Sequence, residues 1–293
     1  MEDLKRLGMY ARTYLSDIKT KKLVANGRTF SYYDVGNGPL VVLLHGFNGT
    51  KVQWRMFMCA LMHRYRLIAL DIPGFVFDAK LSSKEDYSLG PLISHIEDFL
   101  REISAKQIHL VGHSAGSTLA SFYTIENQRQ VSSLTLMAMP ALFKDPDDPL
   151  SIYTQAVETY LPKTPEGISR LLHLLYEKPP RMPHYFLSRY IAAVNEFRGI
   201  RMDVLQEVFR QTGMLVPRLR KLDVPTLYMY GDRDKITPQS SVDYLAAKVP
   251  SIQLHRLDQT GHIPCIEKPT ESAAVFESFI RYCDRYYVNN VAG

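Results

Sequence analysis

Short apolar runs recur along the chain, bounded by Gly, Pro or Asp, and predict strands that are buried on both faces. They lie at Leu40–Leu44, Leu67–Leu70, Ile108–Val111, Leu134–Ala138 and Thr226–Tyr230. Ahead of them, two strand-like stretches between Leu23 and Val35 flank Asn26-Gly27, a dipeptide that readily takes the positive φ angles of a tight hairpin. The pattern therefore predicts an opening β-hairpin and then a mainly parallel sheet.

Segments with helical spacing separate these runs, among them Gly90–Ile103 and the stretch that begins at Ala115. Alternating strands and helices place the chain in the α/β class. The alternation stops between residues 141 and 217, where Tyr, Leu, Arg and several Pro follow helical spacing without a clear strand. We interpret residues 141–217 as a helical lid inserted over the carboxyl edge of the sheet, within one domain that spans residues 1–293.

Residues 1–20 predict an amphipathic helix, because apolar residues recur there at helical spacing: Leu4, Leu7, Ala11, Leu15 and Ile18. Acidic residues dilute the positive charge of this segment, so packing on its own domain is favoured over peripheral contact with a membrane. The segment lacks the apolar core of a signal peptide, and no apolar run approaches the length of a spanning helix. Neither secretion nor a membrane span is expected.

The composition fits a globular protein, with 46% hydrophobic and 22% charged residues in 293. The net charge of +5 is mildly basic, but no dense Lys/Arg block indicates nucleic-acid binding. The arginines of the lid fit a solvated helical face better than a site for an acidic group: Arg181, Arg189, Arg198, Arg201 and Arg210. Three scattered cysteines favour a reducing, cytoplasmic setting, and neither a metal site nor a cofactor is expected.

The candidate nucleophile is Ser114, in the sequence Gly112-His113-Ser114-Ala115-Gly116. This G-x-S-x-G pattern follows a predicted strand and precedes a predicted helix, which is the context in which it carries meaning. Its small residues allow a sharp turn that lifts the serine hydroxyl above the sheet edge. Ser114 is therefore predicted to attack a substrate.

A serine hydroxyl needs a base, and the base needs a partner that fixes its tautomer. His262 follows a late strand-like segment and is the predicted base. Asp232 and Asp234 both follow the strand at Thr226–Tyr230. We favour Asp234, because it lies farther past the strand, where a loop can turn its carboxylate toward His262; Asp232 is the alternative, with a role in the turn.

Donors for a negatively charged oxygen are expected from the backbone. The strand at Leu40–Leu44 leads into His45-Gly46-Phe47, and Ala115 follows the nucleophile at the start of a helix. The N–H groups of Phe47 and Ala115 are thus predicted to converge on one oxygen atom, as an oxyanion hole.

Six segments together resemble the α/β-hydrolase family, in its branch with a helical cap: NGRTFSYYDVGNGP, VVLLHGFNGT, LDIPGF, VGHSAGS, PTLYMYGDRDKITP and TGHIPCIEKP. The resemblance implies a mostly parallel eight-stranded sheet flanked by helices. It also implies Ser114, Asp234 and His262 as the catalytic triad, and Phe47 and Ala115 as the oxyanion hole. Epoxide hydrolases and haloalkane dehalogenases of this family carry an aspartate nucleophile, so Ser114 excludes their substrates. The chain departs from the family after Phe75 and in having Ala115 where Met or Leu is common.

The function expected from these residues is a serine hydrolase that cleaves a carboxylic ester through an acyl-enzyme on Ser114, with a small or medium, largely apolar acyl substrate. Two alternatives remain open. The same triad could serve a C–C bond hydrolase or a thioesterase, because only the pocket distinguishes them. A protein that keeps the fold to bind a ligand without catalysis is the alternative of another class.

Overall fold

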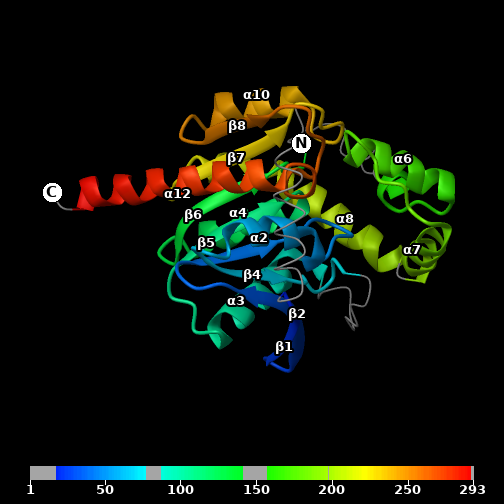
Figure 1. Cartoon of the computed structure of the whole chain (residues 1–293), viewed down its shortest axis with the longest axis horizontal. Coiled ribbons are helices and arrows are strands. Elements are labelled where there is room, and N and C mark those ends of the chain that lie inside the picture. The colour runs from blue at the N-terminus through cyan, green and yellow to red at the C-terminus, as the bar shows by residue number, and fades with distance from the viewer. Residues whose placement is uncertain (1–17, 77–86, 141–156, 197, 292–293) are drawn as a thin grey trace.

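One sheet runs through the molecule, with its strands in the order β1-β2-β4-β3-β5-β6-β7-β8 (Figure 1). The structure, a computed structural model, describes residues 18–76, 87–140, 157–196 and 198–291, except the side chains of residues 186 and 286–291. β2 pairs antiparallel with β1 and with β4, and the pairs that follow are parallel. The strands are β1 (Thr20–Ala25), β2 (Arg28–Val35), β3 (Leu40–Leu44), β4 (Arg66–Leu70), β5 (Ile108–His113), β6 (Val131–Met137), β7 (Thr226–Gly231) and β8 (Gln253–Leu257).

This sheet confirms the predicted fold class, and the predicted hairpin is present where β1 turns into β2. Asn26 and Gly27 take positive φ angles of 47° and 72°, as the tight turn requires. Most of the helix predicted over residues 1–20 lies outside the described residues. Its predicted end differs from the structure, because Thr20 already pairs with Tyr33 in the hairpin.

Helices cover both faces of the sheet (Figure 1). Their bounds are η1 (Lys51–Trp54), α2 (Arg55–Leu61), α3 (Leu89–Glu102), α4 (Ala115–Glu126), α6 (Pro165–Leu175), α7 (His184–Glu196), α8 (Arg198–Gly213), α9 (Val216–Leu219), α10 (Gln239–Lys248), α11 (Pro264–Glu267) and α12 (Pro269–Val291). α3, α4, α9 and α10 pack on one face, whereas α2 and α12 pack on the other.

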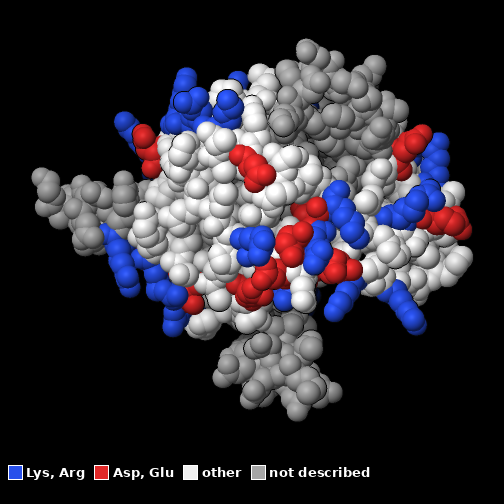
Figure 2. Space-filling view, turned by 90° about the horizontal axis from the view of Figure 1, so that it is seen from above, with Lys and Arg blue, Asp and Glu red and all other residues white. Residues whose placement is uncertain are grey.

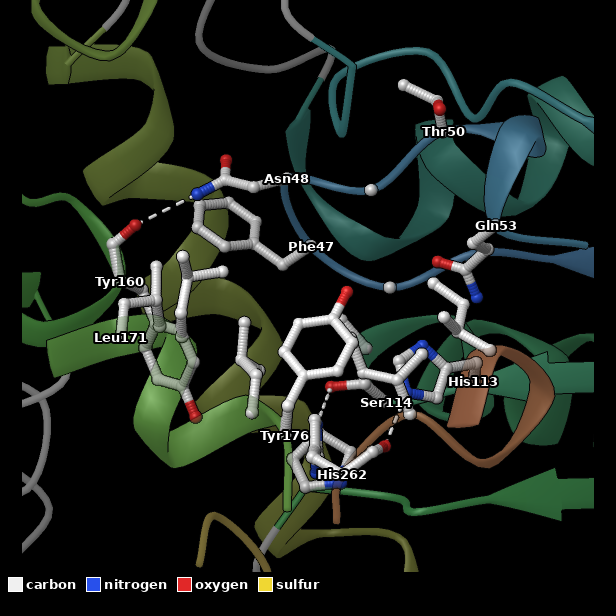
Figure 3. Close-up of a pocket in the computed structure, with 18 of the residues that line it drawn as sticks. Phe47, Asn48, Thr50, Gln53, His113, Ser114, Tyr160, Leu171, Tyr176 and His262 are labelled. Atoms are coloured by element: carbon white, nitrogen blue, oxygen red, sulfur yellow. Dashed lines mark hydrogen bonds between the residues drawn. The ribbon is translucent and has the colours of Figure 1, made fainter. Parts of the chain in front are cut away.

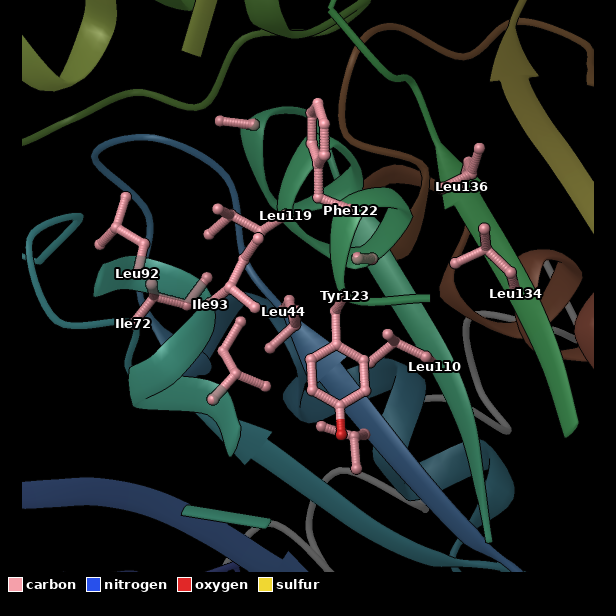
Figure 4. Packing of buried hydrophobic residues seen from close by; sticks show 14 of the residues in the cluster. Leu44, Ile72, Leu92, Ile93, Leu110, Leu119, Phe122, Tyr123, Leu134 and Leu136 are labelled. Atoms are coloured by element: carbon pink, nitrogen blue, oxygen red, sulfur yellow. The ribbon is translucent and has the colours of Figure 1, made fainter. Parts of the chain in front are cut away.

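The core explains why the strands read as continuous apolar runs. Successive side chains of a strand point to opposite faces of the sheet. In β3, Val42 and Leu44 therefore join the core beneath α3 and α4, while Val41 and Leu43 join the core beneath α2 and α12. Figure 4 shows the first of these cores, where Leu119, Phe122 and Tyr123 of α4 lie over the sheet. Both faces are covered, so both sets of strand positions must be apolar.

A helical segment, which we call the insertion (residues 157–219), lies between β6 and β7. It contains α6, α7, α8 and α9, and its described residues form no strand. α6 begins where sequence chemistry favours it, since the Thr164 hydroxyl accepts from the Gly167 N–H (3.1 Å) and Pro165 is the first helical residue. Residues 141–156 of the predicted lid lie outside the described residues. Among the helices that the structure describes, none is long and apolar enough to cross a membrane.

Candidate active site

Ser114 occupies a strained turn between β5 and α4. Its φ of 51° and ψ of −125° lie where residues other than Gly are uncommon. The backbone around it holds this conformation: the Ser114 N–H donates to the Met137 carbonyl (2.9 Å), and the Ser117 N–H donates to the Ser114 carbonyl (2.8 Å). The turn places the serine at the carboxyl end of β5 and at the amino end of α4.

Two glycines of the turn are required by close backbone contacts. A Cβ on Gly116 would lie 2.4 Å from the Leu44 carbonyl oxygen and 2.5 Å from that of His45. A Cβ on Gly112 would lie 2.4 Å from the Gly116 carbonyl oxygen. α4 can therefore approach β3 and β5 only because these positions carry no side chain.

We expect Gly116→Ala to lower the free energy of unfolding by about 3 kcal/mol, because neither backbone carbonyl beside the new methyl group can move freely. Gly90→Ala in α3 is the matched control. Its Cβ would have nothing within 4 Å, and alanine favours a helix by about 1 kcal/mol over glycine. Urea unfolding of both variants measures the difference, and equal stabilities would contradict this account of the turn.

A chain of hydrogen bonds joins three side chains from separate parts of the sequence, and Figure 3 shows its link between Ser114 and His262. Ser114 Oγ lies 2.9 Å from His262 Nε2, and His262 Nδ1 lies 2.9 Å from Asp234 Oδ2. The side chains of His262 and Asp234 are almost completely buried. A carboxylate accepts the Nδ1–H, so Nε2 is left to accept the proton of the serine hydroxyl.

The two candidate acids lie in different places. Asp234 also accepts, through Oδ1, from the N–H groups of Ile236 (2.8 Å) and Thr237 (2.9 Å), which fix its carboxylate toward His262. Asp232 instead accepts from the Thr260 N–H (3.2 Å) and holds the turn at the end of β7. The structure thus brings Asp234, rather than Asp232, to the histidine.

Glu267 holds the loop that carries His262, a role that the sequence patterns did not predict. Its carboxylate accepts from the N–H groups of Gly261 (3.0 Å) and Ile263 (3.3 Å), on either side of the histidine, and from that of Glu177 in the insertion (2.8 Å). Burial raises the pKa of Glu267. Glu267 ends the single turn of α11, five residues after His262. This short separation was the one feature of the sequence that could have indicated its contact with the loop.

Two further histidines near the site orient backbone groups. The Nε2–H of His113 donates to the His262 carbonyl (2.8 Å). The Nδ1–H of His45 donates to the Gly46 carbonyl (2.8 Å), while its Nε2 accepts from the Ile72 N–H (2.9 Å). Burial lowers the pKa of His45 to about 4 and that of His113 to about 3, so both are neutral near pH 7.

These two histidines predict acid sensitivity. In the unfolded chain each takes up a proton below its ordinary pKa near 6.5, whereas the folded protein resists protonation until about pH 4 and below. Their contribution to stability is therefore complete above pH 6.5 and is lost as the pH falls toward these lowered values. We expect a lower Tm at pH 5 than at pH 7.5.

His113→Gln separates this effect from the titration of carboxylates, because the Gln side-chain amide can donate to the His262 carbonyl but does not titrate. Its Tm should change less between pH 7.5 and pH 5 than that of the wild type. An unchanged difference in Tm would show that His113 does not contribute.

The two residues predicted to supply the oxyanion donors come from the loop after β3 and from the start of α4. Phe47 follows β3, and Ala115 is the first residue of α4, where the helix dipole favours negative charge. Both line the same cavity as Ser114. Gly46 allows this approach, because a Cβ there would lie 3.0 Å from the Ser114 Cβ and 3.1 Å from His113 Nδ1.

Ser114 and His262 open onto a cavity of about 450 Å³. In Figure 3, Phe47, Tyr160 and Leu171 lie on one side of Ser114, and Thr50 and Gln53 lie on the other. The insertion supplies a largely apolar wall, which includes Ile168, Leu171, Leu175, Leu205, Val208 and Phe209. Such a cavity suits an apolar group attached to a carbonyl beside Ser114.

Charged groups are sparse in this cavity and mixed on the surface. In the described parts of the chain, no three His, Cys, Asp or Glu side chains come together to hold a metal ion. Acidic and basic side chains intermingle near the middle of the face in Figure 2.

The prediction that the arginines of the insertion lie in solvent is wrong for Arg201, which is buried with 2% of its surface exposed.

Fold and site together define an α/β protein with a serine, histidine and aspartate joined by hydrogen bonds at the carboxyl edge of its sheet. The chain belongs to the alpha/beta hydrolase fold family, whose model matches residues 39–269. This agrees with the resemblance in the sequence.

Two relatives align with most of the chain. It is 27% identical over 259 residues to monoacylglycerol lipase ABHD6 of Homo sapiens, covering 84% of this chain and 76% of the relative. It is also 27% identical to the pimeloyl-[acyl-carrier protein] methyl ester esterase of Aeromonas hydrophila, covering 84% of this chain and 96% of the relative.

Solved structures share the fold. A membrane phospholipase A superposes with a TM-score of 0.81 at 24% identity, covering 96% of this chain and 92% of that one. A meta-cleavage product hydrolase from Pseudomonas fluorescens superposes with a TM-score of 0.75 at 24% identity, covering 91% and 99%.

Proposed function

We propose that the protein is a serine hydrolase that cleaves carboxylic esters. The observation that carries this proposal is the hydrogen-bonded chain from Asp234 through His262 to Ser114, opening onto an apolar cavity. The relatives named above as a lipase and a methyl ester esterase both act on esters, which favours an ester over the thioester or C–C bond of the alternatives.

Each step of the proposed reaction is assigned to one of the groups described above. Ser114 Oγ attacks the ester carbonyl carbon while His262 Nε2 takes the hydroxyl proton, and the Asp234 carboxylate stabilises the resulting imidazolium. The N–H groups of Phe47 and Ala115 bind the oxyanion of the tetrahedral intermediate. The intermediate collapses to an acyl-enzyme as His262 gives the proton to the departing alcohol.

Water completes the proposed cycle. His262 removes a proton from a water molecule, which attacks the carbonyl carbon of the acyl-enzyme. Collapse of the second tetrahedral intermediate breaks the bond to Ser114 Oγ and returns the proton from His262 to that oxygen. The products are a carboxylic acid and the free enzyme.

The substrate proposed for this site carries a small or medium, largely apolar acyl group. The cavity volume of about 450 Å³ and the apolar wall of the insertion support this size and character. We interpret the insertion as a lid over the site.

The proposed location is the cytoplasm. The three cysteines are buried and unbridged, which supports a reducing, cytoplasmic location.

A chain-length series of p-nitrophenyl esters tests the proposal. We expect kcat/KM to be highest for short or medium acyl chains and to fall for long ones, and turnover of a matched thioester or vinylogous diketone to be lower. Faster turnover of the thioester or the diketone would favour the corresponding alternative. Binding of an apolar ligand without turnover of any ester would favour a non-catalytic protein.

A pair of variants in α6 tests which wall receives the acyl group. Leu171 lines the cavity, whereas Leu174, three residues along the same helix, is outside its lining. Leu171→Trp should shorten the preferred acyl chain by filling cavity space, and Leu174→Trp should leave the preference unchanged. The same preference in both variants would place the acyl group elsewhere.

A further inference from the structure

Arg201 of α8 is an unusual residue in the insertion. Its side chain is long and charged, yet only 2% of the residue is exposed, and such residues are seldom fully buried without partners. Its guanidinium donates through Nη1 to Asn48 Oδ1. The buried charge of the insertion is therefore directed at the loop that follows β3.

Asn48 is the residue after Phe47, and its side chain binds the insertion through both ends of its amide. While Oδ1 accepts from Arg201, Nδ2 donates to the Tyr160 carbonyl (2.9 Å) and to the Tyr190 hydroxyl (3.3 Å). Its φ of 58° is left-handed, which Asn tolerates better than most residues. These three contacts fix Asn48 against the insertion rather than against the sheet.

The loop itself is a tight turn with Phe47 and Asn48 at its centre. The Gly49 N–H donates to the Gly46 carbonyl (2.9 Å), which also accepts from His45 (2.8 Å). The first residue of the turn, Gly46, is thus held by the buried side chain of His45. The centre of the turn, which carries the Phe47 N–H, is held from the insertion through Asn48.

We propose that Arg201 is a positioning residue for the oxyanion hole: by holding Asn48, it aims the backbone N–H of Phe47 at the oxygen that becomes negative during catalysis. This inference rests on the proposed ester hydrolysis. It makes the insertion part of the catalytic machinery as well as a cover, because the oxyanion hole is complete only while α8 is docked on the loop. An N–H group that points away from the oxyanion stabilises the transition state much less than one that points at it.

The charge on Arg201 strengthens the contact. Burial lowers the pKa of Arg201 to about 10, so the guanidinium is protonated at the pH of an ordinary assay. A hydrogen bond from a charged donor is stronger than one between neutral groups. The neighbouring Tyr190 and Tyr87 also favour the protonated form.

The test compares two arginines of α8. Arg201→Met should lower kcat for a p-nitrophenyl ester about 10- to 100-fold, somewhat less than complete loss of an oxyanion donor, with KM within about threefold of the wild type. The matched control is Arg198→Met, since Arg198 donates to the Leu161 carbonyl within the insertion (2.5 Å) instead of to Asn48. It should leave kcat unchanged.

A trifluoromethyl ketone provides a readout specific to the oxyanion hole, because its adduct with serine carries a negatively charged oxygen. Arg201→Met should weaken its binding by the same factor as kcat, and the control should not. Arg201→Lys, which retains a charged donor, should recover part of both losses. A rise in KM with unchanged kcat would overturn the inference, since it would assign Arg201 to the shape of the pocket.

A double-mutant cycle with Asn48→Gly tests whether Arg201 acts through Asn48. Glycine removes the amide and tolerates the positive φ. If the two residues act together, the double variant should be no slower than the slower single variant; losses that multiply would overturn the inference. Failure of the proposed function is distinguishable, because the wild type would then hydrolyse no ester and bind the trifluoromethyl ketone no better than the corresponding methyl ketone.

Discussion

Ser114→Ala is expected to lower kcat for ester hydrolysis by about 10⁴- to 10⁶-fold, since the remaining groups can bind a substrate but cannot form an acyl-enzyme. KM should change little, because the hydroxyl contributes to the transition state rather than to binding. The melting temperature should be close to that of the wild type. The experiment is a measurement of kcat and KM on a short-chain p-nitrophenyl ester.

Ser121→Ala is the matched control for this substitution. Ser121 is another buried serine, on α4, whose hydroxyl donates to the Ser117 carbonyl within the helix (2.8 Å). Its removal should leave kcat within about twofold of the wild type, because this hydrogen bond lies within α4 and does not reach the reacting groups. Substantial turnover by Ser114→Ala would exclude Ser114 as the nucleophile.

Asp234→Asn is the second substitution with a large expected effect, a loss of about 10⁴-fold in kcat. The amide can present an N–H to His262 Nδ1 and so stabilise the wrong tautomer, in which Nε2 carries the proton and cannot accept one from Ser114. The imidazolium also loses its partner. The protein should remain folded, because the substitution preserves the size of the side chain.

Asp232→Asn provides the comparison for this effect. Both acids follow β7 and both accept a backbone N–H, but Asp232 binds Thr260 instead of His262. Its substitution should change kcat by less than about tenfold, through the turn alone. Equal losses in the two variants would mean that the separation of roles between these carboxylates is wrong.

The sheet and the turn at Ser114 could be predicted because local patterns determine them. Strands such as Leu40–Leu44 send side chains to both faces of the sheet, and both faces are buried. Every position of such a strand must therefore be apolar, which makes the run visible in the sequence. The turn at Ser114 is marked by the G-x-S-x-G pattern itself, although the contacts that require Gly116 come from the Leu44 and His45 carbonyls of a distant strand and loop. The covering helices α2 and α12 were not predicted, because their burial depends on partners distant in the chain.

The supporting contacts of the site were not predicted from the periodicity of the sequence. Spacing could favour Asp234 over Asp232, but it could not reveal that Glu267 binds the backbone on both sides of His262. A helical arginine is ordinarily solvated, so Arg201 gave no sign of its contact with Asn48, 153 residues away. The contact of Arg201 with Asn48 and that of Glu267 with the Glu177 N–H are set by how the insertion packs on the loops, which periodicity does not encode.

Labelling with a fluorophosphonate probe tests the central claim most directly, because the probe reacts with an activated serine and leaves a covalent adduct that can be located. We predict one adduct per chain, found by peptide mass spectrometry on Ser114, in the wild type. His262→Ala should abolish it, and pre-incubation with a short-chain ester should slow it. No adduct on Ser114 in the folded wild-type protein, or equal labelling in the His262→Ala variant, would contradict the account.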